Sequence, residues 1–151
     1  MNPNFELFRT QRKMVGSFLE NYSLEQLNTI PTGFTNNLFW NIAHIVVTQQ
    51  LLVYKLSGLP MMISDDLVEK YKKGTSVTGL ATAEEVAEVK GLLLDTISQT
   101  ENDFKNGFFK DFVEYPTSAG FTLTSVNDAI DFNSFHEGLH IGIMMGIRKF
   151  L

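Results

Sequence analysis

The chain has 151 residues and a formal net charge of −5, with 44% hydrophobic and 19% charged residues. This length and composition are typical of one globular domain, here residues 1–151, and exclude a disordered chain. The acidic balance argues against nucleic-acid binding, which needs a basic face, and the lack of cysteine excludes disulfides and thiolate metal ligands.

The N-terminal segment MNPNFELFRT has neither the basic start nor the apolar run of a signal peptide. Polar residues interrupt every apolar stretch well short of the length that a membrane span requires. We therefore expect a cytoplasmic protein without a membrane segment.

Helical periodicity begins with a segment from about Pro3 to Asn21, whose apolar residues recur on one face. After an irregular connector, Thr35 is a plausible N-cap for a second helix that ends at Gly58. The broad apolar coverage of this second helix predicts burial on most sides. A short helix is expected around DDLVEKYKK, and its lysine-rich end is interpreted as solvated.

A capping-box pattern at Thr82 and Glu85 opens a third long helix, which should stop at Gly107. Residues 108–124 alternate weakly and predict a small extended excursion rather than a real sheet. Ser125 then caps a final helix that reaches the C-terminus. Four long helices with long connections predict an all-α four-helix bundle with a short extra helix and an irregular connector.

The chain has three histidines, and all of them fall on the two most apolar predicted helices. His136 and His140 are four residues apart, so they share one face of the last helix, while His44 lies on the second helix. Neutral imidazoles are good ligands for Zn, Ni, Fe or Cu, and three of them leave a coordination position open. Facing helices of a bundle can bring such side chains together.

Each histidine also has a purely structural interpretation. His44 alone, inside NIAHIVV, would be a hydrogen-bonded core histidine, and the pair His136 and His140 is evenly balanced between chance and a metal site. A buried ring without a partner costs free energy, however, and the chain places no histidine elsewhere. We therefore predict a metal site made of His44, His136 and His140. Acceptors for the second ring N–H groups are expected among Asn37, Asn41, Asn133 and Glu137.

The segment HEGLH also matches the H-E-x-x-H signature of zinc metalloproteases, with Glu137 as the general base. The extended signature requires a Gly and a His where this chain has Ile143 and Gly146, and no acidic ligand follows. We reject the protease interpretation. Glu137 lies about 100° around the helix from His136, so a solvated carboxylate or one that supports a ligand is expected.

Three glycines at four-residue spacing, Gly138, Gly142 and Gly146, form a ridge roughly opposite the histidine face. Such a ridge lets another helix approach closely. It predicts either close packing inside the chain or a subunit interface.

Two segments, LFWNIAHIVVTQQLLVYKLSG and FHEGLHIGIMMGIRKF, resemble the DinB-like (DinB/YfiT) superfamily. The resemblance implies an up-down-down-up four-helix bundle and frequently a homodimer. It also implies one divalent metal ion, Zn or Ni, held by His44 in a W-x-x-x-H segment that begins at Trp40, together with His136 and His140.

The resemblance implies an activity only broadly, as a thiol-dependent S-transferase-like or hydrolase-like enzyme of unknown substrate. Because the chain has no cysteine, a low-molecular-weight thiol would have to come from solution. Ile143 stands where the family often carries Gln, and we assign no catalytic residue. The alternative is a non-catalytic, metal-dependent small-ligand binding or stress-response protein. Its expected pocket would be lined by Trp40, Phe132, Phe135 or Met144.

Overall fold

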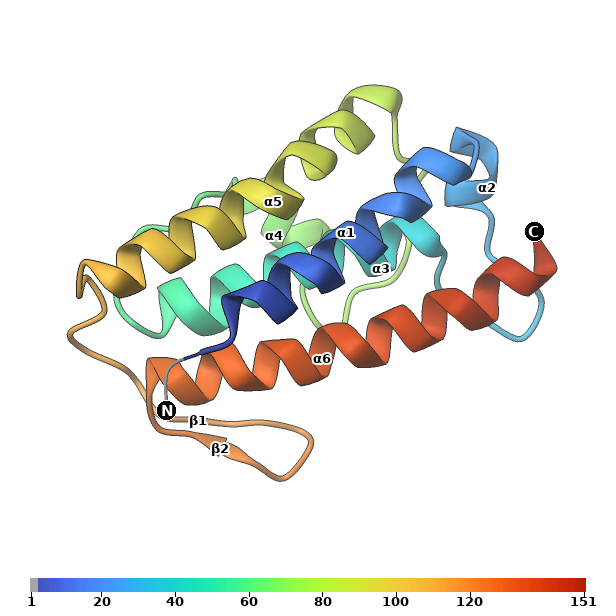
Figure 1. The fold of residues 1–151 in the computed structure, drawn as a ribbon. Coiled ribbons are helices and arrows are strands. Elements are labelled where there is room, and N and C mark those ends of the chain that lie inside the picture. The colour runs from blue at the N-terminus through green and yellow to red at the C-terminus, as the bar shows by residue number, and fades with distance from the viewer. Residues whose placement is uncertain (1–2) are drawn as a thin grey trace.

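The computed structural model describes residues 3–151, and helices dominate it (Figure 1). The predicted all-α bundle is confirmed. Its long helices are α1 (Phe5–Asn21), α3 (Leu38–Gln49), α5 (Ala83–Lys105) and α6 (Val126–Ile147). Shorter helical elements are α2 (Leu24–Asn28), the π-helix η1 (Gln50–Lys55) that continues α3, α4 (Asp65–Tyr71) and the 3-10 helix η2 (Arg148–Phe150).

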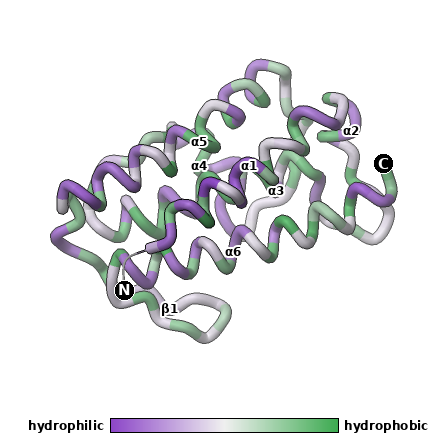
Figure 2. The backbone as a smooth tube through the Cα atoms, in the orientation of Figure 1, coloured by the Kyte–Doolittle hydropathy of each residue, from purple (hydrophilic) through white to green (hydrophobic). Residues whose placement is uncertain are grey.

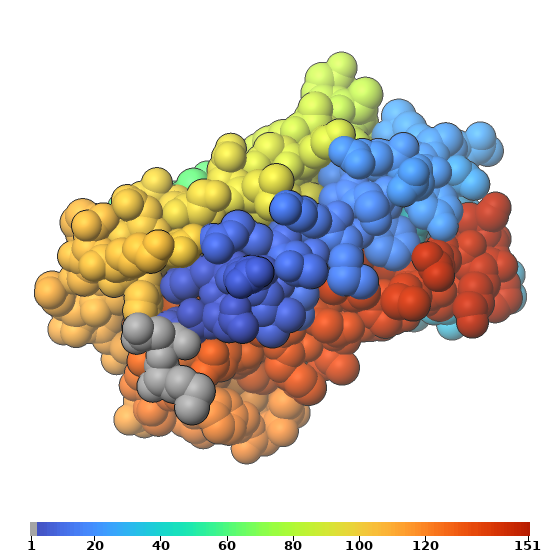
Figure 3. Space-filling model, in the orientation of Figure 1, coloured from blue at the N-terminus to red at the C-terminus, as the bar shows by residue number. Residues whose placement is uncertain are grey.

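The long helices follow the up-down-down-up order, because α1 and α6 run in one direction and α3 and α5 in the other (Figure 1). Helices α1 and α3 each pack against both α5 and α6. Figure 3 shows the face of the molecule on which α1 lies between α5 and α6. Since α3 and α5 are parallel, the chain must return between them, and α4 lies in that connection.

Polar caps begin three of the long helices where the sequence predicts them or close by. Thr82 and Ser125 cap α5 and α6, whereas Asn4 caps α1, which begins at Phe5, two residues after the predicted start at Pro3. The second helix begins later than predicted. Its N-cap is Asn37, whose Oδ1 accepts a hydrogen bond from the Trp40 N–H at 2.8 Å. The predicted cap, Thr35, makes no such capping hydrogen bond.

The connections contain one helix that the sequence pattern did not predict and two features that it did. The first connector holds α2, which a reciprocal capping box between Ser23 and Gln26 begins. The predicted extended excursion is confirmed as two short antiparallel strands, β1 (Tyr115–Pro116) and β2 (Thr122–Leu123). The left-handed φ of 68° at Gly58 fits its predicted role in ending the second helical segment.

Burial follows the predicted pattern most closely in α3. Of its twelve residues, all of which the structure describes, Thr48 alone is not buried. The outer helices instead mix hydrophilic and hydrophobic residues along their length (Figure 2). None of the helices among residues 3–151 combines the length and apolar composition that a membrane crossing requires.

Candidate metal centre

His44 on α3 and His136 and His140 on α6 come together where these antiparallel helices pack. Each offers one ring nitrogen, and these three atoms lie within 4.8 Å of one another. The Nε2 atoms of His136 and His140 are 3.1 Å apart. With a Zn–N distance of about 2.0–2.1 Å, this separation corresponds to an angle of roughly 100° at a shared ion. The cluster therefore could hold a metal ion.

Hydrogen bonds set the orientation of two of these rings. His44 Nδ1–H donates to the Tyr71 carbonyl at 2.6 Å, and His140 Nδ1–H donates to Asn41 Oδ1 at 2.7 Å. The Asn41 amide nitrogen donates to two other oxygens, which fixes Oδ1 as the acceptor. In both rings Nε2 therefore carries the lone pair that can bind a metal ion.

The third ring, that of His136, has no such hydrogen bond. His136 Nδ1 is buried without a hydrogen-bond partner among the described residues, and so is Asn133 Oδ1 one turn earlier. His136 Nε2 faces the Nε2 lone pair of His140, so a proton or a cation must lie between them. A divalent cation bound by both nitrogens fits this donor set.

Of the four acceptors that the sequence suggested, Asn41 alone makes a hydrogen bond to a ligand candidate within residues 3–151. Asn37 caps α3, and the Asn133 amide nitrogen donates to the Ala129 carbonyl. Glu137 pairs with Arg12 instead of with a histidine. The Tyr71 carbonyl was not predicted, because a backbone group carries no residue-type signal.

The prediction of a solvated or ligand-supporting Glu137 is wrong. Its side chain and that of Arg12 on α1 are both fully buried, and Arg12 Nη2 lies 2.7 Å from Glu137 Oε1. Arg12 Nε also donates to this oxygen at 2.8 Å. Burial raises the pKa of Glu137, while the guanidinium of Arg12 lowers it. Glu137 therefore joins α6 to α1 instead of serving as a base beside the histidines.

Burial also controls the charge of the histidine cluster. Desolvation is the main cause that lowers the pKa of His136 to about 3 and that of His140 to about 4, and repulsion from neighbouring imidazoles contributes to both values. The pKa of His44 is lowered by desolvation, although its bond to the Tyr71 carbonyl acts in the opposite direction. All three rings are therefore neutral at pH 7, which is the form that binds metal.

These pKa values predict that the metal-free protein loses stability in mild acid. The unfolded histidines gain protons below their ordinary pKa of 6.5, whereas His136 and His140 stay neutral in the folded state down to about 4. The unfolded state thus binds more protons as the pH falls. The expected loss between pH 6.5 and pH 5 is about 1.5 kcal/mol per histidine, measured by urea unfolding of the apoprotein. A His136→Asn/His140→Asn variant should show a flatter pH dependence, and an unchanged slope would contradict the assignment.

The histidines open onto a pocket of about 490 Å³. Its apolar wall comes mainly from η1 and α6 and contains Leu51, Leu52, Leu56 and Phe132. The expectation for Phe132 is confirmed, but three expected wall residues lie elsewhere. Trp40 and Met144 belong to the core, and Phe135 is exposed to solvent.

Thr48 stands at the boundary between the pocket and the histidines. Its hydroxyl donates to His44 Nε2 at 3.3 Å, and the side chain lines the pocket. A ligand that takes up this nitrogen lone pair would release the hydroxyl toward the pocket.

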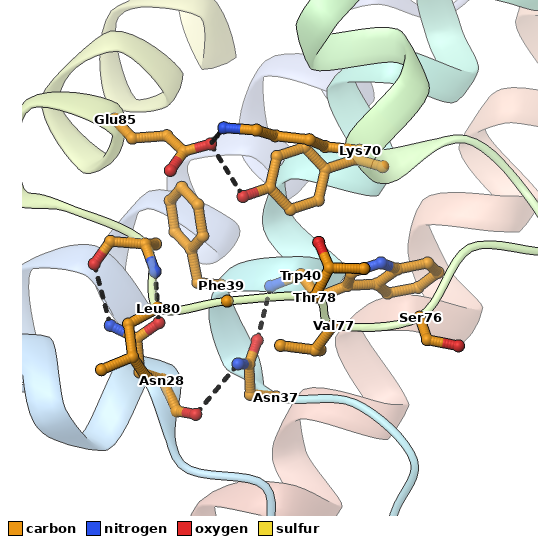
Figure 4. Close-up of a pocket in the computed structure, with 13 residues that line it drawn as sticks. Asn28, Asn37, Phe39, Trp40, Lys70, Ser76, Val77, Thr78, Leu80 and Glu85 are labelled. Atoms are coloured by element: carbon orange, nitrogen blue, oxygen red, sulfur yellow. Dashed lines mark hydrogen bonds and ion pairs between the residues drawn. The ribbon is translucent and has the colours of Figure 1, made fainter.

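Trp40 supports His44 by stacking. The two ring centroids are 4.6 Å apart with an interplanar angle of 10°, and Trp40 Nε1–H donates to Thr75 Oγ1 at 3.3 Å. A smaller pocket lies beside Trp40 (Figure 4). Its volume is about 70 Å³, and no histidine of the described residues lines it.

The hydrogen bonds around this smaller pocket hold the segment that contacts His44. Glu85 Oε1 accepts from Lys70 Nζ and from the Tyr71 hydroxyl, each at 3.0 Å (Figure 4). The Glu85 carboxylate therefore anchors α4, the helix whose last residue supplies the carbonyl to His44. The predicted capping pattern is half confirmed, because Thr82 Oγ1 accepts from the Glu85 N–H.

Replacing Asn41 with leucine is expected to lower metal affinity by about 10- to 100-fold, because the acceptor that orients His140 is lost. Metal titration against a competing chelator measures the effect. Asn21→Leu is the matched control, because it makes the same substitution at an exposed residue of α1 whose amide nitrogen donates to the Ser17 carbonyl and not to the Asn41 network. Equal affinity of Asn41→Leu and the parent protein would show that the hydrogen bond does not orient the ligand.

Comparison with known proteins agrees with this arrangement of helices and histidines. The sequence profile described as DinB superfamily matches residues 7–144, which include all three histidines and most of the bundle. A comparison with curated proteins found no match. Because the profile covers most of the sequence, the chain belongs to the DinB superfamily.

Proposed function

We propose that the protein binds one divalent metal ion, Zn or Ni, through His44, His136 and His140, and acts as a metal-dependent enzyme on a small molecule. The observation that carries this proposal is the convergence of ring nitrogens whose orientation is set from behind by Tyr71 and Asn41. These hydrogen bonds select the tautomer that binds metal and hold the rings in place before the ion arrives.

A metal ion held by three histidines would keep a coordination position open, and the pocket lies beside these rings. A divalent ion bound here would supply Lewis acidity and lower the pKa of a water or thiol at that position. The chain's own residues exclude water from one side through Trp40 and the buried faces of α3 and α6. Because the chain has no cysteine, an S-transfer reaction needs a diffusible small thiol.

A non-catalytic ligand-binding role is the second candidate, and the composition of the pocket wall favours it. Among the described residues, no carboxylate lines the pocket, so no carboxylate stands ready as a general base. A hydrolase-like reaction would depend on the group bound at the open position for its base.

Elemental analysis of the purified protein tests the metal, and a panel of electrophiles with small thiols tests catalysis. We expect one equivalent of metal per chain and turnover that disappears after chelation. Tight ligand binding without turnover of any electrophile would favour the second candidate. Absence of bound metal after loading with Zn²⁺ or Ni²⁺ would contradict both.

We also propose that the protein is a homodimer that pairs through the exposed face of α6. Phe135, Leu139 and Ile143 are 54%, 51% and 38% exposed on this face. A Cβ added at Gly138 or Gly142 would touch nothing, so internal packing does not explain these glycines. An exposed apolar stripe with small residues supports close approach of a second copy.

The dimer is tested by replacing Leu139 with glutamate, which places a charge in the middle of the apolar face. Light scattering at micromolar concentration should report about twice 17.1 kDa for the parent protein and a monomer for Leu139→Glu. Leu80→Glu is the control, because Leu80 is 79% exposed on the connection before α5. A monomeric parent protein would refute the dimer.

A further inference from the structure

The pocket at the histidine cluster has a charge opposite to that of the whole chain. The chain carries −5, yet the charged residues that line this pocket are Lys55 and Lys73, with no acidic residue among the described ones. Lys55 ends η1, and Lys73 lies two residues beyond α4. A divalent ion with neutral ligands would add further positive charge at the inner end.

The two lysines also form no ion pair with the residues that the structure describes. Neighbouring Lys70 and Lys72 form ion pairs with Glu85 at 3.0 Å and Glu69 at 2.6 Å. Lys55 and Lys73 have no ion-pair partner anywhere in residues 3–151. No acidic side chain of the described residues pairs with them, so their charges are available to a molecule in the pocket.

The rest of the wall indicates the shape of such a molecule. The apolar side chains of Leu51, Leu52, Leu56 and Phe132 line the same pocket as the lysines and the histidines. Tyr115 and Ser118 add hydroxyls to it, and neither hydroxyl is engaged in a hydrogen bond within the described chain. The wall suits a short apolar chain with polar ends.

We propose that the pocket takes a small organic dianion. One anionic group occupies the open metal position, the apolar chain lies against the leucines and Phe132, and the second anionic group pairs with Lys55 and Lys73. Lysine binds such a group as a point charge. This inference rests on the proposed function, because it names the substrate class of the same site.

Adipate and hexanoate test the proposal, because they share one carbon skeleton and differ in the second carboxylate. The Co²⁺-loaded protein is titrated with each acid, and the visible absorption of the ion reports binding. Hydrophobic burial alone would favour hexanoate. We expect adipate to bind about tenfold more tightly, with an advantage that shrinks as salt is added.

Lysine variants locate the effect. Lys55→Gln and Lys73→Gln should each weaken adipate binding by about three- to fivefold and leave hexanoate binding and metal content unchanged. Lys72→Gln makes the same change in net charge, but Lys72 does not line the pocket, so it should change neither acid. Equal binding of the two acids, or equal effects of all three variants, would overturn the proposal.

A metal-free arm separates this inference from the metal proposal. Ligand-observed NMR of the apoprotein should still detect weaker adipate binding that depends on Lys55 and Lys73. A protein that binds no metal but shows this lysine-dependent preference would refute the metal centre and retain the dianion site. A protein that binds metal but shows no preference for adipate would retain the metal centre and refute the dianion site.

Discussion

His44→Ala is expected to lose most of its bound metal, and His136→Ala and His140→Ala should do the same. The pair on α6 supplies two imidazoles from one helix, so the third ligand must come from α3. Two imidazoles do not complete a site of the kind that structural or catalytic Zn occupies. Elemental analysis after dialysis, together with chelator competition, measures the loss.

Thr48→Val is the control for the histidine variants. It keeps the side-chain shape and all three rings but removes the hydroxyl that donates to His44 Nε2. Its metal content should match that of the parent protein. If His44→Ala kept a full equivalent of tightly bound metal, the three-histidine site would be wrong.

Breaking the buried pair between Arg12 and Glu137 is expected to destabilise the fold by about 3–5 kcal/mol. Arg12→Met leaves a carboxylate without its cation in a site with no exposed surface. Urea unfolding followed by circular dichroism at pH 7 gives the free energy. A double variant, Arg12→Met/Glu137→Leu, should recover most of the loss, because it removes both charges.

Arg9→Met is the matched control for this measurement. Arg9 lies one turn earlier on α1 and pairs with Glu101, but the Arg9 side chain is 38% exposed. Its loss should cost less than about 1 kcal/mol. Equal effects of the two arginine variants would show that burial does not govern the strength of the Arg12 pair.

The histidine cluster could be predicted because each piece of it is a local pattern. The spacing of His136 and His140 fixes their shared face, and the apolar surroundings of His44 fix its burial. That the two helices face each other was inferred from the cost of burying unpaired rings and from the absence of any other histidine in the chain. The chain direction of the helices followed from the resemblance to a family and not from periodicity.

Arg12 was missed although its own helix carried a signal. It occupies a position on the stripe of α1 that also buries Phe5, Phe8 and Val15, where an arginine is unusual. Its partner lies 125 positions away, and no local pattern links them. An arginine on an otherwise apolar stripe is therefore a reason to search for a buried acid.

The position of the two pocket lysines, Lys55 and Lys73, could not be predicted for a different reason. Lys73 was interpreted as part of a solvated helix end, and its side chain is indeed exposed. Its place in the pocket wall depends on the path of the chain after α4, which no periodicity specifies. The π-helical turns of η1, which carry Lys55 and contact α6, are likewise not specified by any periodicity of the sequence.

The stack of Trp40 on His44 makes the protein an optical reporter of its own centre. Trp40 is the one tryptophan in the chain, so all indole emission comes from a ring 4.6 Å from a ligand candidate. An open-shell ion such as Ni²⁺ quenches a nearby excited indole, whereas closed-shell Zn²⁺ does not. Emission spectra recorded before and after chelation would therefore distinguish which kind of ion the native protein carries, without a label and before any substrate is known.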